Sequence, residues 1–272
     1  MSTSKKTYSL ALDYHENTKK IQVSDSFETK QQYKIYPAAK SFPLMSDGMD
    51  LSDGFVRAVL SRKSTRSFTD GNIKLSALSK LLSLSFGLRG DFENPDLRTY
   101  ASAGARYPIE VYLVMLRSDD LPKGIYHYNV KDSSVELLKE GCFLEEASRF
   151  YANQNNAITT GFPCLILFSM IAGRTMEKYN ERGYRFALLD AGNMGQNLYL
   201  TAAYLGLGVV ALGAGADSDD ALDDMLGINK HGESVFFGFA VGHPMSSANV
   251  NAKANANENV NVNENVNVNE ND

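Results

Sequence analysis

Two segments about forty positions apart carry the side chains with the clearest chemistry. Residues 61–68 read Ser-Arg-Lys-Ser-Thr-Arg-Ser-Phe and place Arg62, Lys63 and Arg66 among several hydroxyl groups. Arginine donates bidentate, charge-assisted hydrogen bonds to a phosphate. By itself, however, such a basic segment is more typical of a solvated helix end. Residues 102–105 read Ser-Ala-Gly-Ala, and side chains this small let a backbone lie flat against a planar ligand. Together the two segments predict a site for flavin mononucleotide (FMN), which joins a flat ring system to a ribityl phosphate.

Apolar periodicity predicts the elements that position these segments. The strongest pattern covers residues 184–205, where an apolar stripe is accompanied by small or apolar residues on the other faces, as in a central and mostly buried helix. Gly206 and Gly208 follow it as a helix end. Further helices are expected over residues 53–61, 76–86 and 219–226, and strands over residues 109–116, 124–128, 135–139, 164–170, 209–212 and 235–241.

The composition limits the classes of function. The 272 residues are 43% hydrophobic and 22% charged, as in globular proteins, and the apolar runs are too short to span a bilayer. The net charge is −5, and residues 248–272 contribute −3 of it through one lysine, three glutamates and one aspartate. The remaining −2 argues against nucleic acid or a membrane as the main partner. Cys142 and Cys164 lack CxxC spacing and the histidines are scattered, so neither a disulfide scaffold nor a metal site is expected.

Composition also divides the chain into three parts. Residues 1–50 are polar and are expected to form an extended arm, and residues 51–247 carry the periodic patterns of a folded domain. Residues 248–272 alternate asparagine with other residues and have too few apolar side chains to fold alone, which favours disorder over an added edge strand. The first residues precede no apolar signal core, so we expect a cytoplasmic protein.

Several motifs occur in an order that resembles the nitroreductase superfamily of flavin-dependent enzymes. They are Arg-x-Ser-x-Arg-x-Phe at 62–68, Leu-x-x-Leu-Leu at 78–82, Ser-Ala-Gly-Ala-x-Tyr-Pro-x-Glu at 102–110, Gly-Leu-Gly at 206–208 and Gly-His-Pro at 242–244. Further motifs at 14–19, 33–37, 124–128 and 190–200 are similar to the SagB-type dehydrogenases, the branch that contains the oxidases of thiazole- and oxazole-forming peptide pathways. The resemblance runs from about Tyr14 to Pro244.

The resemblance implies an α+β fold of the nitroreductase type, with a central, mostly antiparallel sheet flanked by helices. It also implies an intertwined homodimer that binds FMN where the subunits meet. The block at 102–105 would then approach the flavin ring from the other subunit, and the turn at 212–215 would face flavin N5 and O4, although such a turn alone is most often a plain strand–helix connection. The residues that the resemblance implies at the cofactor are Arg62, Lys63, Ser64, Arg66, Ser102, Ala103, Gly104, Ala105, Asn193, Gln196, Leu212, Gly213, Ala214 and Gly215.

The resemblance also implies roles for the basic residues. Arg62, Lys63 and Ser64 would hold the phosphate and the ribityl chain, and Arg66 would lie near the ribityl chain or the pyrimidine edge. A cation there would stabilise the charge that collects on the reduced flavin. Nitroreductases usually carry a basic residue after Gly-His-Pro, whereas only Lys253 follows it here. Phosphate binding would therefore depend on Arg62, Lys63 and Arg66, or the chain would bind the flavin less tightly.

A lysine–tyrosine pair lies beside the flavin in the azoline-oxidising relatives, and Lys178 and Tyr179 occupy the matching place. Aromatising a thiazoline or oxazoline removes a proton from Cα and a hydride from Cβ, so a buried lysine or tyrosine could take the proton. By itself the dipeptide is more typical of a solvated helix face. The implied function is FMN-dependent oxidation of azolines in a peptide substrate, with a cyclodehydratase as a candidate partner.

Two other functions stay open. One is an NAD(P)H-dependent nitro- or quinone reductase. The folded part has no G-x-G-x-x-G turn after a strand, but relatives that use nicotinamide bind it transiently over the flavin, so this does not exclude the reductase. The other is a flavin-bound scaffold subunit of a peptide-modifying complex.

Overall fold

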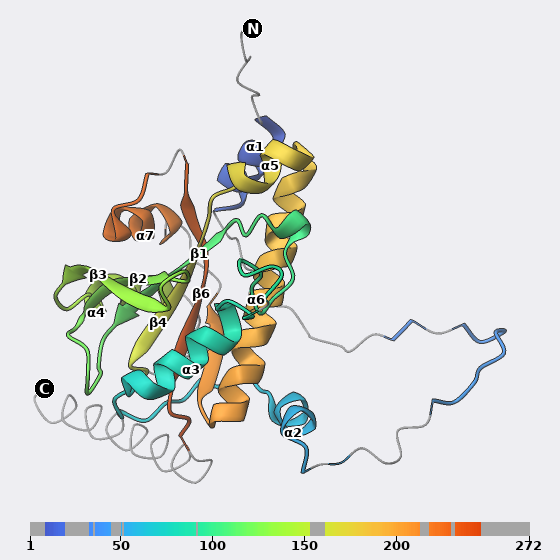
Figure 1. The fold of residues 1–272 in the computed structure, drawn as a ribbon, viewed down its shortest axis with the longest axis horizontal. Helices are drawn as coiled ribbons and strands as arrows, with labels where there is room; N and C mark the ends of the chain where they lie inside the picture. The colour runs from blue at the N-terminus through green and yellow to red at the C-terminus, as the bar shows by residue number, and fades with distance from the viewer. Residues whose placement is uncertain are drawn as a thin grey trace, which may run out of the picture.

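The computed structural model describes residues 9–19, 33–34, 36–44, 50, 52–90, 92–152, 161–212, 218–229 and 232–245. Figure 1 shows a central sheet with helices on both sides. In chain order the elements are α1 (Ser9–Thr18), α2 (Gly54–Ser61), α3 (Leu75–Phe86), the 3₁₀ turn η1 (Ala103–Ala105), β1 (Ile109–Met115), β2 (Gly124–Asn129), β3 (Ser134–Glu140), α4 (Leu144–Ala152), β4 (Cys164–Met170), α5 (Gly173–Tyr179), α6 (Arg182–Leu205), β5 (Gly208–Leu212), α7 (Ser218–Leu226) and β6 (Ser234–Gly242).

The six strands form one sheet in the order β3-β2-β1-β4-β6-β5, and neighbouring strands run antiparallel. At its centre, Leu113 of β1 lies opposite Ile166 of β4. Alternate side chains of β4 enter two different cores, since Ile166 and Phe168 pack with α3 and α6 whereas Leu165 packs with α4 and α7. Because both faces are covered, β4 is buried along its whole length and its sequence is apolar almost throughout.

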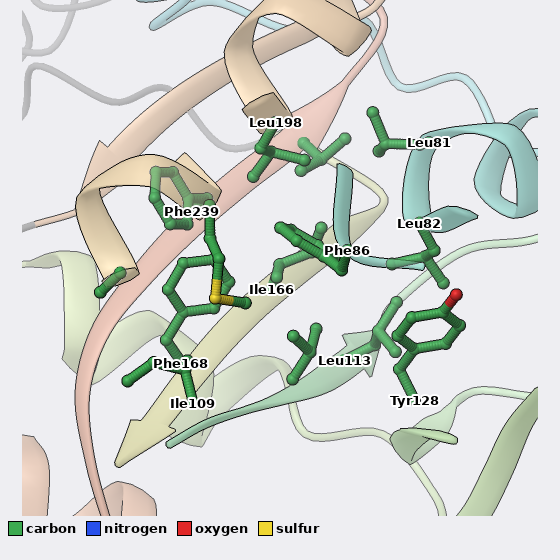
Figure 2. Packing of buried hydrophobic residues seen from close by; sticks show 14 of the residues in the cluster. Leu81, Leu82, Phe86, Ile109, Leu113, Tyr128, Ile166, Phe168, Leu198 and Phe239 are labelled. Carbon is green, nitrogen blue, oxygen red and sulfur yellow. The ribbon is translucent and has the colours of Figure 1, made fainter. Parts of the chain in front are cut away.

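Figure 2 shows the core on the side of α3 and α6. Phe86 of α3 meets Phe168 of β4 edge-on, with ring centroids 5.5 Å apart, and the Phe168 ring lies 5.1 Å from that of Phe239 on β6. Leu198 of α6 is fully buried in the same layer. Aromatic pairs of this kind add about 0.5–1.5 kcal/mol to the stability gained from buried area. The layer thus fixes α6 against the sheet.

Helix α6 has 24 residues and is therefore about 36 Å long. Its predicted apolar stripe is buried at Ala191, Leu198 and Ala202, and the helix ends at Gly206, whose φ of 71° is a left-handed conformation that favours glycine. The helix is central and mostly buried, as expected, although some residues on its other faces remain exposed in the single chain. Leu189 and Tyr204 are 64% and 57% exposed, even though the start of α2 at Gly54 lies close to the Tyr204 ring.

The predicted fold class is confirmed, and the predicted strand at 164–170 has the observed bounds. The sequence patterns do not predict α1, α4 or α5. Helix α1 has little apolar periodicity and α5 has only seven residues, whereas α4 is amphipathic and the prediction overlooks it. Helix α1 lies within the part expected to be extended. It docks through His15, whose ring nitrogens lie 2.9 Å from Tyr184 Oη and 3.3 Å from Ser234 Oγ. The asparagine-rich tail at 248–272 lies outside the described residues, and the division into three parts stays a prediction.

Two general features of the described residues limit the kinds of site to consider. None of the helices in the described ranges has both the length and the apolarity needed to cross a membrane. Within the same ranges, no group of three or more histidine, cysteine, aspartate or glutamate side chains is arranged to hold a metal ion.

Candidate active site

The small residues at 102–105 form a tight turn before β1, and we call residues 102–107 the 102–107 loop. Figure 1 shows this green turn beside α6. Three of its residues have left-handed backbones, with φ of 63° at Gly104, 51° at Ala105 and 47° at Tyr107. A left-handed backbone costs a residue with a side chain about 1–2 kcal/mol, so contacts with the rest of the protein must hold the loop in place.

The buried carboxylate of Asp190 on α6 makes the contacts that hold the first half of the loop. Its side chain accepts hydrogen bonds from Ser102 Oγ at 2.5 Å and from Ala103 N at 3.2 Å. Ser102 Oγ in turn accepts from Tyr107 N at 2.9 Å, which closes the loop on itself. Only 3% of Asp190 is exposed, and this burial raises its pKa, although the two hydrogen bonds act in the opposite direction.

Two asparagines of α6 hold the chain just before the loop. Asn193 Nδ2 donates to Ala101 O at 3.1 Å, and Asn197 Nδ2 donates to Thr99 O at 3.2 Å. Asn193 is one of the residues expected at the cofactor, and its side chain remains largely exposed. Helix α6 thus holds residues 99–103 through polar side chains one or two turns apart.

The pair Lys178 and Tyr179 lies directly against the loop in the same chain. A Cβ placed on Gly104 would lie 2.6 Å from Tyr179 Oη and 2.7 Å from Lys178 Nζ, so only a glycine fits there without displacing them. The half-buried Tyr179 ring packs edge-on against Phe186, with centroids 5.0 Å apart. Lys178 is exposed, and its Nζ lies 5.2 Å from the centre of the Tyr179 ring. The structure therefore brings the predicted pair and the predicted loop together.

Two arginines tie helix α5, which carries the pair, to the second half of the loop. Arg106 Nε donates to Arg174 O at 2.6 Å, and Arg106 forms an ion pair with Glu177 at 3.0 Å. Arg174 donates to Tyr107 O at 3.0 Å and also forms an ion pair with Glu110 of β1. The loop and α5 are therefore joined by side-chain contacts at both of these arginines.

His127 of β2 extends this network. Its ring nitrogens lie 3.1 Å from Glu110 Oε2 and 3.0 Å from Glu136 Oε2. Because a carboxylate only accepts hydrogen bonds, this arrangement favours the charged imidazolium, in which both nitrogens donate. The hydrogen bond to Glu110 raises the pKa of His127, and burial only partly opposes it. Burial disfavours the charged form of Glu110, but the hydrogen bonds from His127 and Arg174 outweigh it and leave the Glu110 pKa lowered.

Residues 61–68, which we call the basic segment, begin at the end of α2. Helix α2 starts at Asp53, whose side chain caps the N–H groups of Phe55 and Val56. After the helix, the segment runs beside β5, where Thr65 N donates to Val209 O at 2.9 Å. It then pairs with the Gly-His-Pro motif through a bridge between Phe68 and Pro244, and Met245 N, just after the motif, donates to Ser67 O at 3.0 Å. Two motifs far apart in the sequence thus lie side by side.

A cavity of about 370 Å³ lies between the basic segment and α6, and its lining includes Ser61, Lys63, Thr65 and Tyr199. The Arg62 guanidinium lies 5.4 Å from the centre of the Tyr199 ring. This tyrosine is held in place, because its Oη lies 3.3 Å from Ser64 Oγ and accepts from Ala211 N at 2.8 Å. Cations and hydroxyl groups beside an open cavity fit the phosphate and ribityl chain of FMN.

The basic segment and the 102–107 loop contact different parts of α6. Asp190 and Tyr199 are nine residues apart, which corresponds to roughly 13.5 Å along the helix and about 180° around it. Figure 1 shows α2 near the lower end of α6 and the turn before β1 beside its upper half. Gln196 lies between the two contacts and is exposed. The single chain therefore does not bring the two groups of expected cofactor residues to one place.

The remaining predicted residues fall into two groups. Arg66 is exposed, and Leu212 is buried at the end of β5. Gly213, Ala214 and Gly215 lie outside the described residues, as does Lys253. Their roles stay predictions.

The sequence reasoning missed three residues that organise the site: Asp190, Arg174 and Tyr199. Asp190 had a signal, because it is a lone carboxylate directly beside the apolar stripe of residues 184–205. Such a residue is costly to bury unless hydrogen bonds satisfy it, and that cost marks it as a structural contact. Asp190 and Tyr199 also lie in the motif at 190–200 that carries the resemblance, although neither is assigned a role there, whereas Arg174 had no comparable signal.

The family model for nitroreductases matches residues 59–243 of the chain. The chain is 30% identical over 162 residues to MJ1384 of Methanocaldococcus jannaschii, which is named as a nitroreductase, and the match covers 59% of this chain and 79% of that protein. It is 31% identical over 124 residues to the microcin B17-processing protein McbC of Escherichia coli, with 43% of this chain and 45% of McbC covered. The chain thus matches less than half the length of McbC.

A solved structure has a fold similar to that of this chain. The E. coli microcin synthetase McbBCD complex, solved with truncated pro-MccB17 bound, contains a chain that superposes with a TM-score of 0.69 at 22% sequence identity. The superposition covers 86% of this chain and 92% of that one. Because the family model spans the strands, α6 and both groups of site residues, the chain belongs to the nitroreductase family.

Proposed function

We propose that this oxidoreductase of the nitroreductase family uses FMN to oxidise azoline rings in a peptide to azoles. The observation that carries the proposal is the contact of Lys178 and Tyr179 with Gly104. It places two side chains that can exchange protons beside a tight turn of small residues, whose backbone a planar cofactor could approach closely. The relative McbC, named for processing microcin B17, supports a peptide as the substrate class.

The cofactor proposal depends on the basic segment. Arg62, Lys63 and Ser64 would hold the phosphate and the ribityl chain, with the cavity beside Tyr199 as the space next to them. Bound FMN would supply the oxidising chemistry by accepting a hydride. We expect purified protein to be yellow and to release FMN rather than FAD on heating. A colourless protein that takes up no added FMN would contradict this part.

The chain's own residues would handle the proton. Lys178 Nζ and Tyr179 Oη lie side by side at the loop, so either could accept the Cα proton of the azoline directly or through the other. Tyr179 is fixed against Phe186, whereas Lys178 is exposed in the single chain. Exclusion of water from Lys178 would therefore come from the bound peptide or from a second subunit.

A homodimer would complete the site. Large apolar side chains are exposed along α2 and the outer face of α6: Phe55 is 71% exposed, Leu60 63%, Leu189 64% and Tyr204 57%. Exposed apolar surface on this scale is typical of an interface. A second copy packed here would cover α6 and bring its 102–107 loop towards the basic segment of the first. Leu189→Glu should shift the dimer to monomer in analytical ultracentrifugation and release FMN; a stable dimer with FMN retained would contradict this arrangement.

Anaerobic mixing with a thiazoline-containing peptide tests the function. We expect one turnover to bleach the visible flavin absorbance and to lower the peptide mass by two hydrogens. Bleaching by NADPH and turnover of nitro-aromatic compounds, without reaction of the peptide, would favour a reductase, in line with the name of MJ1384. Bound flavin without reaction towards either substrate would favour a scaffold subunit.

A further inference from the structure

We propose that Asp190 is a positioning residue, which acts through Ser102 and Ala103 to fix the 102–107 loop and, through Gly104, the reacting side chains of Lys178 and Tyr179. This inference rests on the proposed azoline oxidation for its kinetic consequences. Its structural consequence, the rigidity of the loop, can be measured without any substrate.

The location of Asp190 argues for a specific task. The carboxylate lies next to Ala191 and one turn from Ala187 and Met194, and these neighbours are fully or almost fully buried. A buried carboxylate surrounded by apolar side chains costs stability unless it is well hydrogen-bonded, whereas an apolar residue at the same place would pack without that cost. The presence of a carboxylate at this buried position is therefore best explained by the hydrogen bonds that it makes to the loop.

The two oxygens of Asp190 meet two donors from the same turn. One accepts from Ser102 Oγ at 2.5 Å and the other from Ala103 N at 3.2 Å. Because the only hydroxyl proton of Ser102 points to Asp190, its lone pairs are free to accept from Tyr107 N at 2.9 Å. One carboxylate thus sets the direction of both hydrogen bonds of the Ser102 hydroxyl and also accepts from the next backbone N–H.

The loop transmits this order to the pair by direct contact. Gly104 follows Ala103 and lies against Lys178 Nζ and Tyr179 Oη. Since Ala105 and Tyr107 keep unfavourable left-handed backbones, the loop is expected to relax once the hydrogen bonds to Asp190 are lost. A relaxed loop would leave the pair without its support, and a misplacement of about 1 Å can slow a reaction about 10²-fold.

Asp190→Asn is the informative variant because it changes the hydrogen bonding but hardly the volume. An amide offers one oxygen and one NH₂ group, so either Ala103 N would face another donor or Ser102 would have to turn its hydroxyl away. The chain also contains a matched control. Asp223 of α7 is buried and accepts from Ser234 Oγ at 2.8 Å and Val235 N at 2.7 Å, on the opposite side of the sheet.

Hydrogen exchange of the intact flavoprotein gives the first readout. In Asp190→Asn we expect amides 102–107 to exchange at least about tenfold faster, because hydrogen bonds that close the loop are lost. In Asp223→Asn we expect faster exchange around Val235 and an unchanged loop. If Asp190→Asn proves unstable, Ser102→Ala provides the same test, and Ser102→Thr, which keeps the hydroxyl, should restore protection. Unchanged exchange of the loop in Asp190→Asn or Ser102→Ala overturns the proposal.

Isotope effects give the second readout. We expect Asp190→Asn to lower kcat about 10–100-fold with little change in KM, and the effect of deuterium at the substrate Cα to increase as proton removal becomes rate-limiting. Asp223→Asn should keep the wild-type kcat and isotope effect even where its melting temperature falls. An equal loss of kcat in both variants, or a wild-type isotope effect in Asp190→Asn, contradicts positioning. Failure of the wild type to oxidise azolines would instead contradict the proposed function, while the exchange measurement would still test Asp190.

Discussion

The basic segment and the 102–107 loop are held in opposite ways, although both contact α6. The basic segment is fixed by its backbone, which pairs with β5 and the Gly-His-Pro motif, and its cations Lys63 and Arg66 stay exposed. The loop is fixed by side chains, above all by the buried Asp190, and its backbone is left-handed at three positions. A phosphate needs charge that can adjust to it, whereas proton transfer needs fixed geometry. The two designs suit these two tasks.

The same difference predicts that substitutions in the two regions affect different quantities, either the reaction rate or the binding of the cofactor. Changes in the loop and in α5 should affect rates and leave the cofactor bound, because they alter geometry. Changes in the basic segment should affect binding and leave the chemistry of the bound form intact, because they alter charge. The following predictions test this division.

The largest effect is expected at the pair. Lys178→Ala and Tyr179→Phe should retain FMN but slow azoline oxidation about 10²–10⁴-fold, the usual contribution of a general base. Stopped-flow flavin reduction measures this step. Reoxidation of the reduced flavin by oxygen serves as the control and should stay near normal, because it requires no substrate base. Full turnover by the double variant with FMN bound would remove the pair from the mechanism.

Gly104→Ala should lower the rate by about 10²-fold, because the added Cβ would lie 2.6 Å from Tyr179 Oη and displace the pair. Single-turnover rates measure the effect on the reaction, and flavin content measures the effect on cofactor binding. Gly90→Ala is the matched control, since Gly90 has a similar φ of 74° and no atom within 4 Å of an added Cβ. Both variants should lose about 1 kcal/mol of stability from the backbone alone. Equal activity of the two would show that the contact with Gly104 has no catalytic importance.

Arg62→Ala should weaken FMN binding by about 1.5–3 kcal/mol, the range of a charge-assisted hydrogen bond. Titration of the apoprotein with FMN, followed by quenching of flavin fluorescence, measures the affinity. Once the variant is saturated with FMN, its turnover should return to near the wild-type value. A large loss of rate at saturation would contradict the prediction that the basic segment affects only the binding of the cofactor.

The smallest effect concerns pH. His127 has a raised pKa in the folded protein, so its contribution to stability is complete below the unfolded value of about 6.5 and is lost as the pH rises through the folded value. The stability difference between wild type and His127→Gln should therefore shrink from pH 6 to pH 9, by no more than about 1 kcal/mol. Thermal unfolding measures it. From pH 6 to pH 9 the 102–107 loop should become more mobile while the affinity for FMN stays constant. An equal increase in the mobility of the basic segment would contradict the view that the two regions are held independently.

The sequence predicts much of the fold because the strands and α6 have strong periodic patterns, as in Cys164–Met170. It also predicts the basic segment, whose chemistry is local. The support of the loop is different. Asp190 and Ser102 are 88 residues apart, and the contact of Gly104 with Tyr179 joins a turn to a seven-residue helix that has no periodicity of its own. Contacts of this kind depend on how elements pack. The lone carboxylate of Asp190 indicates a buried contact, but the sequence does not say which residues that carboxylate meets.

The position of both regions on one continuous helix restricts how the protein can change. Inserting one residue between Asp190 and Tyr199 would shift one contact by about 1.5 Å and rotate it by about 100° relative to the other. A deletion would do the same in the opposite sense, and even a four-residue insertion would separate the contacts by about 6 Å. Insertions and deletions should therefore be tolerated in surface connections, such as that between β2 and β3, but not in the middle of α6. The length of this helix between the two contacts must therefore stay constant, even where its exposed residues are substituted.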